Sequence, residues 1–567
     1  MNRDGRHWNH IIVGGGSAGC VAAAELSADP RRNVLLLEAG RDTPPGDEPP
    51  ETLDPYYARA MRLENFWPDL RARWTAEMTD MPGRAATFYE QARILGGGSS
   101  VNSMVAVRAV PDDFAEWAEL GLKGWSWDDI LPFYMEIERD IDFGDRPEHG
   151  NSGPIPIRRH ECEAWPGFCK AVGNAAGRCG LRYIDDLNAD FGDGYSRVPM
   201  NSTPQRRVSA AAAFLDRDVR ARPNLEIRTS TAVTRVIVEE GCATGVETER
   251  HGAAETIRAA SIVLAAGAIW SPTILQRSGI GPASHLAGVG VPVAVDLPEV
   301  GANLQEHATV SVAAFLRRDA CQSPELRSHA NMAFRARARL PEAEGADIYA
   351  AVMAKSSWHE MGRRLGNVLV SLHRPHSRGR VSLVSGDPSV GPDVDFRILE
   401  HPHDRTRLAD GVRLAFELLS DPEARATYLG RPFLAAYSPF VQSLNRYTRW
   451  NAVRSAAATA LVDFSGPLRS HLIDGLLASG TDAADVLADQ ERLEHWMFEN
   501  ATGFFHPAGT CAMGTVVDAA GSVRGVDRLH VIDASIMPRI IRANTNITTM
   551  AAALKLARGI RCKVDNT

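Results

Sequence analysis

The sequence predicts a mixed α/β fold with two domains, because its ends and its middle carry different patterns. An apolar run at 11–13 leads through a glycine turn into a helix, and a second apolar run follows at 34–37. Strand, helix and strand in this order are typical of a parallel sheet with helices packed on it. Between 310 and 500, strand-like and helical patterns alternate without this regularity. That region indicates a separate domain built on a mixed or antiparallel sheet with helices.

The glycines between the first strand and its helix predict a dinucleotide site. Gly14 permits a tight turn, Gly16 lets a pyrophosphate approach the backbone, and Gly19 lets the helix pack closely on the strand. The helix N-terminus favours the anion, because unpaired N–H groups point at it. Glu38 follows Gly19 by 19 residues, at the end of the second strand, where it can accept hydrogen bonds from both ribose hydroxyls and disfavours a 2′-phosphate. This pattern alone leaves both FAD and NAD open as the ligand.

The other elements follow from capping residues, alternation and turn composition. Segment 41–90 is rich in Pro, Asp and Glu, which predicts long surface connections. Helices are predicted at 112–117, 126–134, 207–220, 404–419, 485–498 and 546–560. Strands are predicted at 225–229, 232–239, 244–249, 262–267, 366–372, 379–383 and 529–533. The strand at 262–267 ends in glycine, so we expect its end to be a second place where the core sheet contacts the ligand.

Composition argues against several classes of protein. With 567 residues, 44% hydrophobic and 23% charged, the chain resembles a globular protein of two or three domains. A net charge of −8 and a pI near 6.1 predict no nucleic-acid partner and no basic membrane-binding surface. The polar N-terminus and the short apolar runs predict a cytoplasmic protein without signal peptide or transmembrane segment. Eight cysteines without a Cys-x-x-Cys pair predict neither a disulfide framework nor a metal site.

Two further blocks have the composition of cofactor loops and helix ends. Residues 92–104 contain a Gly-Gly-Gly-Ser-Ser run, which can fold against a flat ring system and offer it N–H groups and hydroxyls. Residues 267–281 combine Ser271 and Pro272, which suit a helix start, with Gly279, which suits its end.

A last block pairs His506, at the start of a His-Pro-Ala-Gly-Thr-Cys segment, with an Asn-Thr-Asn segment that holds Asn544 and Asn546. Together with the glycine pattern, these blocks resemble the glucose-methanol-choline (GMC) oxidoreductases, a family of flavoproteins, over residues 11–560. The resemblance implies a Rossmann-like FAD-binding domain and a discontinuous substrate-binding domain. It is weakest at 308–500, where substrate choice is expected to lie.

The resemblance also implies domain limits and a cofactor site. The FAD-binding domain would comprise 1–110, 205–307 and 505–567, and the substrate-binding domain with its connections 111–204 and 308–504. Val101 stands where some members carry a histidine linked covalently to the flavin, so the FAD is expected to be non-covalent. The expected cofactor contacts are Gly14, Gly16, Ser17, Ala18, Gly19, Glu38, Ala39, Arg93, Gly97, Ser100, Asn102, Met104, Val105, Val233, Ala266, Asp533, Ala534 and Asn546.

The histidine block predicts the chemistry. An alcohol can give a hydride to a flavin only if its hydroxyl proton leaves at the same stage, and a neutral imidazole is the natural acceptor near neutral pH. The resemblance implies that His506 is this general base and that Asn546 is a second donor, which fixes the substrate oxygen. Asn544 lies only two residues away, and either asparagine could instead be a cap or a turn former. His307 is expected to be structural.

The predicted function is therefore FAD-dependent oxidation of an alcohol to the aldehyde or ketone, with dioxygen or another compound as electron acceptor. The alternative is a hydroxynitrile-lyase-type enzyme, in which the same histidine deprotonates a cyanohydrin without net redox chemistry. A flavin-binding protein without activity would not need His506 and Asn546, and an NAD-dependent dehydrogenase would not need the blocks at 92–104 and 267–281. Neither the alcohol nor the oligomeric state follows from the sequence.

Overall fold

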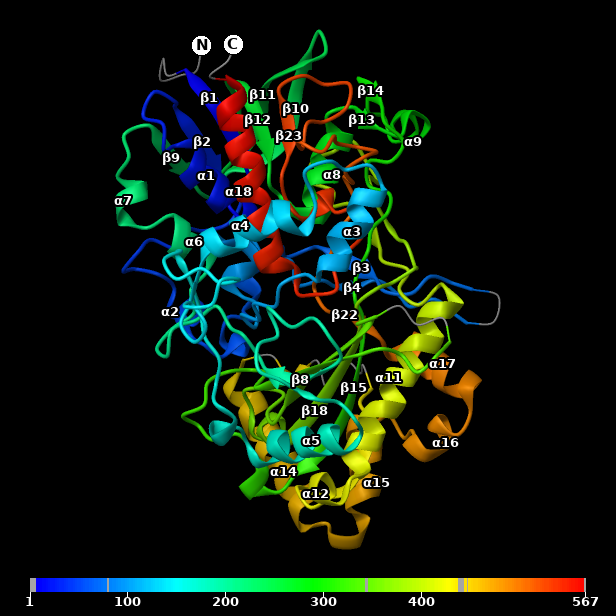
Figure 1. Ribbon diagram of the computed structural model, residues 1–567. Coiled ribbons are helices and arrows are strands. Elements are labelled where there is room, and N and C mark those ends of the chain that lie inside the picture. The colour runs from blue at the N-terminus through cyan, green and yellow to red at the C-terminus, as the bar shows by residue number, and fades with distance from the viewer. Residues whose placement is uncertain (1–6, 79–80, 342–344, 437–442, 446, 565–567) are drawn as a thin grey trace.

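The computed structural model describes residues 7–78, 81–341, 345–436, 443–445 and 447–564. Two large sheets lie toward opposite ends of an elongated molecule, and the first strand and last helix lie at the same end (Figure 1). The predicted mixed α/β fold with two sheets is confirmed. The domain limits drawn from the sequence stay a prediction.

The first sheet has seven strands in the order β10-β11-β12-β1-β2-β9, with β23 beside β12. β1 pairs in parallel with β2 and β12, whereas β10 and β11 form an antiparallel extension. Its strands are β1 (Trp8–Val13), β2 (Val34–Leu37), β9 (Leu225–Arg228), β10 (Ala232–Glu239), β11 (Cys242–Arg250), β12 (Ala253–Leu264) and β23 (Leu529–Val531). Helices α1 (Ser17–Leu26) and α18 (Thr545–Val564) pack against each other beside it (Figure 1).

The second sheet has eight strands in the order β21-β15-β18-β17-β16-β8-β7, with β22 beside β15. All its pairs are antiparallel except β7 with β8. Its strands are β7 (Tyr183–Ile184), β8 (Gly194–Arg197), β15 (Ala308–Leu316), β16 (Met332–Ala336), β17 (Ile348–Met353), β18 (Leu365–Leu372), β21 (Tyr428–Leu434) and β22 (Thr502–Gly503). Helices α5 (Gly167–Arg178) and α11 (Pro402–Ser420) contact its strands (Figure 1).

Shorter elements connect and cover these sheets. The helices are α2 (Pro50–Leu53), α3 (Pro111–Glu119), α4 (Trp127–Ile137), α6 (Ala210–Phe214), α7 (Arg217–Arg220), α8 (Gly267–Arg277), α9 (Ala283–Gly288), α10 (Glu360–Arg363), α12 (Pro422–Arg425), α14 (Arg449–Phe464), α15 (Arg469–Leu477), α16 (Ala483–Leu487) and α17 (Gln490–Asn500). The strands are β3 (Arg71–Arg73), β4 (Thr87–Phe88), β5 (Glu138–Asp140), β6 (Ile155–Ile157), β13 (Ile280–Gly281), β14 (Val295–Asp296), β19 (Arg380–Ser382) and β20 (Asp393–Asp395).

Two predicted helices are each divided by a capping aspartate. The helix predicted at 207–220 is α6 followed by α7, because Asp216 accepts the N–H of Val219 at 2.9 Å and starts a new helix. The helix predicted at 485–498 is α16 followed by α17. There Asp489 accepts the N–H of Arg492 at 3.1 Å.

Helix α8 begins before Ser271, where the sequence had predicted its start. Pro272 therefore lies inside the helix, where it has no N–H to donate to the carbonyl of Ala268. The hydroxyl of Thr510 donates to that carbonyl at 2.6 Å instead. A side chain more than 200 positions away thus satisfies the group that proline leaves free, which the sequence pattern could not show.

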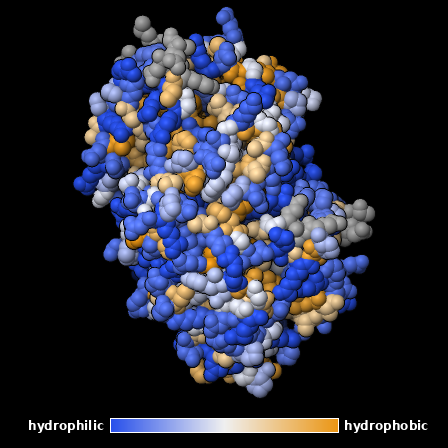
Figure 2. Space-filling view, viewed as in Figure 1, coloured by the Kyte–Doolittle hydropathy of each residue, from blue (hydrophilic) through white to orange (hydrophobic). Residues whose placement is uncertain are grey.

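Segment 41–90 is partly core rather than only surface connection. Its strands β3 and β4 join β19 and β20 in a four-stranded sheet, and Phe66, Trp74 and Tyr89 are buried. Hydrophilic side chains cover most of the face shown in Figure 2. Within the described part of the chain, no helix is long and apolar enough to cross a membrane.

Candidate active site

A cavity of about 1200 Å³ lies where the first sheet meets the second. It exceeds the roughly 300–1,000 Å³ of ordinary ligand sites, so it has room for a large ligand and a small one together. Sixteen of the 18 residues expected at the cofactor line it: Gly14, Gly16, Ser17, Ala18, Glu38, Ala39, Arg93, Gly97, Asn102, Met104, Val105, Val233, Ala266, Asp533, Ala534 and Asn546.

The two glycine loops form one surface because their backbones touch. Gly14 has a φ of 97°, which favours glycine, and a Cβ on Gly19 would lie 1.8 Å from the Gly14 carbonyl oxygen. A Cβ on Gly97 would lie 2.7 Å from Gly16 Cα, whereas one on Gly16 would meet nothing closer than 3.9 Å. No described side chain caps the N-terminus of α1. This end of the cavity therefore fits a pyrophosphate lying against bare backbone.

Glu38 lies on the cavity wall at the end of β2, and each of its two carboxylate oxygens accepts a backbone hydrogen bond. Its Oε2 accepts the N–H of Gly15 and its Oε1 accepts the N–H of Gly40, each at 2.7 Å. Burial raises the pKa of this carboxyl group, and the two N–H donors oppose that change. Each oxygen keeps a lone pair that can accept a ribose hydroxyl. The fit to a dinucleotide thus extends from the glycine loops to the ribose position.

Two expected contacts do not reach the cavity. Gly19 packs against the backbone of Gly14, so its role is to bring helix and strand together. The hydroxyl of Ser100 donates to the carbonyl of Leu95 at 2.8 Å and is fully buried beneath the loop. Ser100 therefore holds the loop in shape, and the expectation that it contacts the cofactor does not fit this placement.

His506 lies on the cavity wall between two polar partners and is only 7% exposed. Its Nδ1 lies 2.9 Å from Nδ1 of His307, and its Nε2 lies 3.2 Å from Nδ2 of Asn544. Its backbone N–H donates to both carboxylate oxygens of Glu306 at 2.9 Å. The ring is thus fixed at both nitrogens, and the loop that carries it is fixed at the backbone.

The asparagine beside His506 is Asn544 and not Asn546, to which the sequence reasoning had given this place. Asn546 accepts the hydroxyl of Ser17 at 2.7 Å and so joins α18 to α1. The reason is geometric, since α18 begins at Thr545 and residues two positions apart in a helix point to different faces. The Asn-x-Asn spacing alone could not distinguish the two residues.

The hydrogen-bond order defines the proton positions on His506. Burial lowers the pKa of His506 well below its usual value, with the neighbouring His307 as the second cause, so the ring is neutral near pH 7. The amide nitrogen of Asn544 can only donate, so Nε2 of His506 carries the lone pair. Its Nδ1 then carries the hydrogen and donates to His307 Nδ1. A basic nitrogen and an amide donor therefore face the cavity side by side.

Three stacked rings lie next to this arrangement. His373 stacks on His307 with centroids 4.1 Å apart, and Tyr349 stacks on His373 at 4.7 Å. All three side chains are fully or almost fully buried, and burial lowers the pKa of His307 to about 3. His307, expected to be structural, is therefore a neutral acceptor beside Nδ1 of His506 and favours the tautomer that carries the hydrogen there. No local sequence signal links the two, because the pairing joins residues 199 positions apart.

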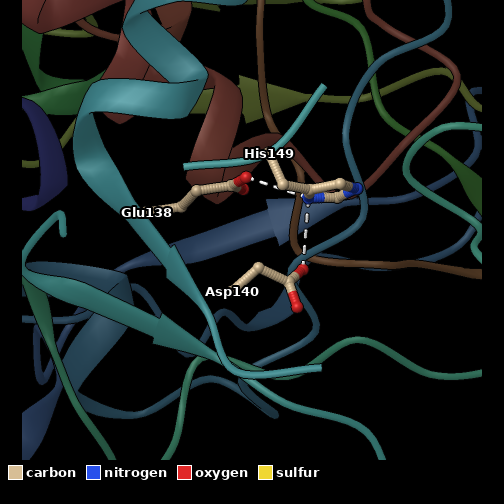
Figure 3. A group of neighbouring side chains, drawn as sticks. All are labelled: Glu138, Asp140 and His149. Carbon is tan, nitrogen blue, oxygen red and sulfur yellow. Dashed lines mark hydrogen bonds and ion pairs between the residues drawn. The ribbon is translucent and has the colours of Figure 1, made fainter. Parts of the chain in front are cut away.

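A second cluster of titratable groups lies outside the cavity (Figure 3). His149 Nδ1 lies 3.0 Å from Glu138 Oε1 and 3.3 Å from Asp140 Oδ2, and its Nε2 lies 2.6 Å from Asp186. The carboxylates raise the pKa of His149 to about 10 against the effect of burial, so the ring is a cation at neutral pH. Arg159 also donates to Asp140 at 2.9 Å, and Arg108 pairs with Glu138, so three cations face the three carboxylates. Since its members already neutralise one another, we assign this cluster to the structure of the fold.

Fold and site together define a class: a dinucleotide-binding sheet joined to a second sheet, with a neutral histidine and an amide facing their shared cavity. Family models described as GMC oxidoreductase match residues 8–309 and 375–553. The chain therefore belongs to the GMC oxidoreductases, whose members are flavoenzymes that use FAD and act on alcohol-type substrates.

Named relatives align along almost the entire chain. The 5-(hydroxymethyl)furfural oxidase of a Methylovorus species is 38% identical over 98% of both proteins. The oxygen-dependent choline dehydrogenase of Escherichia coli is 30% identical over 98% of this chain and 95% of that protein. The crystal structure of pyridoxine 4-oxidase from "Mesorbium loti" superposes with a TM-score of 0.81 at 28% identity, covering 98% of this chain and 99% of the other.

Proposed function

We propose that this enzyme oxidises a primary or secondary alcohol to the aldehyde or ketone, with His506 as general base and Asn544 as hydrogen-bond donor to the substrate oxygen. The observation that supports this most is the pair of His506 Nε2 and Asn544 Nδ2, 3.2 Å apart on the cavity wall. One accepts and the other donates. A substrate hydroxyl that replaces the hydrogen bond between them can donate to Nε2 of His506 and accept from Nδ2 of Asn544.

The chain's own groups perform the proton step. His506 is neutral before reaction, so its Nε2 takes the hydroxyl proton as the C–H bond weakens. Asn544 then donates to the developing carbonyl oxygen, and His307 keeps the other nitrogen of the base protonated. Bound FAD would supply the acceptor of the hydride. The buried rings around His506 exclude water and hold the base in one orientation.

The cofactor is proposed to be held without a covalent bond. Gly14, Gly16 and Gly97 would receive the pyrophosphate and flavin against backbone, and Glu38 would accept the ribose hydroxyls. Val101 lines the cavity but has no nucleophilic atom to bond the flavin. Denaturation in acid should therefore release free FAD and leave a colourless polypeptide.

The substrate class is proposed from the wall next to the base. Phe504 lies 5.0 Å from His506 between ring centroids, and Tyr349, Met353 and Leu369 line the same cavity. These flat and apolar side chains suit an uncharged aromatic or heteroaromatic primary alcohol. The name of the relative at 38% identity, a 5-(hydroxymethyl)furfural oxidase, supports the same class.

The test is anaerobic reduction of the flavin, followed by its absorbance, with 5-(hydroxymethyl)furfural, benzyl alcohol and choline. The two uncharged ring alcohols should bleach the flavin and yield the aldehyde, and choline should be slower. Reoxidation by air or only by a dye then identifies the electron acceptor. Failure of every alcohol to reduce the flavin would overturn the proposed function, and faster reduction by choline would overturn the substrate class alone.

A further inference from the structure

Helix α14 (Arg449–Phe464) presents its apolar side to solvent and its polar side to the protein. Trp450, Val453, Leu461 and Phe464 are 68%, 60%, 55% and 90% exposed. A surface helix of a globular protein normally has the opposite arrangement. These four residues and the exposed alanines between them, Ala456, Ala457 and Ala460, are called the α14 stripe below.

The buried side of α14 shows that this orientation is fixed. The hydroxyl of Ser455 accepts the N–H of Met361 at 2.8 Å and lies 2.9 Å from Nδ1 of His359, so two residues outside the helix hold this side. Asn451 and Val462 are buried on the same side. The helix cannot turn its stripe inward without breaking these contacts. The apolar side chains of the stripe can therefore be buried only by a partner molecule.

The α14 stripe is symmetric about Ala457. Trp450 and Phe464 each lie seven positions from it, and Val453 and Leu461 each lie four positions from it. An antiparallel copy of the same helix, related by a twofold axis through Ala457, would therefore place Trp450 against Phe464 and Val453 against Leu461. The alanines at the centre let two helix axes approach, and large side chains close both ends. A self-complementary patch is the requirement for an isologous dimer.

The area of the stripe fits such a dimer. Trp450 and Phe464 together expose on the order of 300 Å² of aromatic surface. Val453 and Leu461, each more than half exposed, add to this area, and α14 lies at the end of the molecule that carries the second sheet (Figure 1). With an ordinary polar rim, this core supports an interface of about 800 Å² per partner. None of the seven stripe residues is charged, so a second copy of the same apolar surface matches it; Arg449 and Arg454 stand next to Trp450 and Val453 in the sequence.

We propose that the α14 stripe is the twofold interface of a homodimer of this protein. The proposal is independent of the function proposed above, because no residue of the stripe lines the cavity.

The first test measures the mass of the FAD-loaded protein by sedimentation equilibrium over a concentration series. The wild type should be a dimer, and Phe464→Glu should weaken dimerisation about 30-fold or more, as expected for a large aromatic anchor that occurs twice in a twofold interface. Val384→Glu, at an apolar residue that is 54% exposed elsewhere, is the matched control and should remain dimeric. A monomeric wild type, or a Phe464→Glu variant as dimeric as the control, would overturn the proposal.

The second test checks the position of the axis. Ala457→Cys should form a disulfide-linked dimer under mild oxidation, because the twofold axis brings residue 457 of the two copies together. Ala460→Cys should not, since its two copies would lie about 9 Å apart along the helices, beyond the reach of a disulfide. Wild type under the same oxidation controls for the native cysteines. Equal cross-linking of both variants, or wild-type flotation with phosphatidylcholine and phosphatidylglycerol vesicles that Phe464→Glu abolishes, would contradict a dimer interface.

Discussion

The two ends of the cavity are formed by different chemical groups, backbone at one end and side chains at the other. The end formed by the first sheet is mostly backbone: glycine loops that touch each other, and a carboxylate held by two N–H groups. The end formed around His506 is made of side chains from segments 38 and 199 positions away. The first kind of surface depends on local conformation, and the second depends on how distant segments meet. Substitutions should therefore separate cofactor binding from chemistry.

The largest expected effect is at the base. His506→Ala should retain FAD and slow reduction of the flavin by alcohol about 10²–10⁴-fold, the usual contribution of a positioned general base. Stopped-flow absorbance under anaerobic conditions measures the rate, and the flavin spectrum measures cofactor content. Loss of FAD together with activity would show that the two ends of the cavity are not separable.

At the other end, Glu38→Gln should weaken FAD binding and leave the reduction rate of the loaded enzyme unchanged. The substitution replaces a charge-assisted acceptor, which contributes about 1.5–3 kcal/mol, or roughly 10–100-fold in affinity. Fluorescence of released flavin gives the dissociation constant. An unchanged affinity would remove Glu38 from the ribose site.

The two asparagines provide a matched pair. Asn544→Ala should slow flavin reduction about 10–100-fold. It removes one hydrogen bond to an oxygen that develops charge, and such a bond contributes about 1.5–3 kcal/mol. Asn546→Ala removes the bond to Ser17 and an amide on the cofactor side of the cavity, away from His506, and should have a smaller effect on the rate. The same stopped-flow measurement applies to both. A reversed order would return the catalytic role to Asn546.

The smallest effect is a change in pH dependence. Burial, and secondly His307, lower the pKa of His506, so the base is neutral through the neutral range and loses activity only as pH falls below that lowered pKa. His307→Ala admits water and removes the neighbouring ring, so the pKa of His506 should rise toward 6.5 and the acid decline should begin at higher pH. His307→Asn can still accept the hydrogen of His506 Nδ1, so its rate of flavin reduction should lie between that of His307→Ala and that of the wild type. Identical pH profiles in all three proteins would make His307 only structural.

Local patterns predicted much of the fold and the cofactor end of the site. The apolar run before Gly14, the glycine spacing and the position of Glu38 are set by backbone geometry over a few tens of residues, and each lies where the pattern placed it. The strands at β9, β10 and β11 and the helices α3 and α4 were predicted for the same reason. Capping by Asp216 and Asp489 was missed, because a short polar side chain can equally remain in a helix.

Short segments of the sequence were enough to predict a dinucleotide-binding strand, turn and helix and to mark His506 as the candidate base, because a backbone turn and a reactive side chain are properties of short segments. Contacts between distant segments placed Asn544 and His307 at the two nitrogens of His506. They also placed the hydroxyl of Ser100 beneath its loop and the hydroxyl of Thr510 at the carbonyl that Pro272 leaves free. The tertiary structure also decided that α14 turns its apolar side outward. Each of these depends on the direction of a side chain relative to a segment far along the chain, and no local periodicity contains that direction.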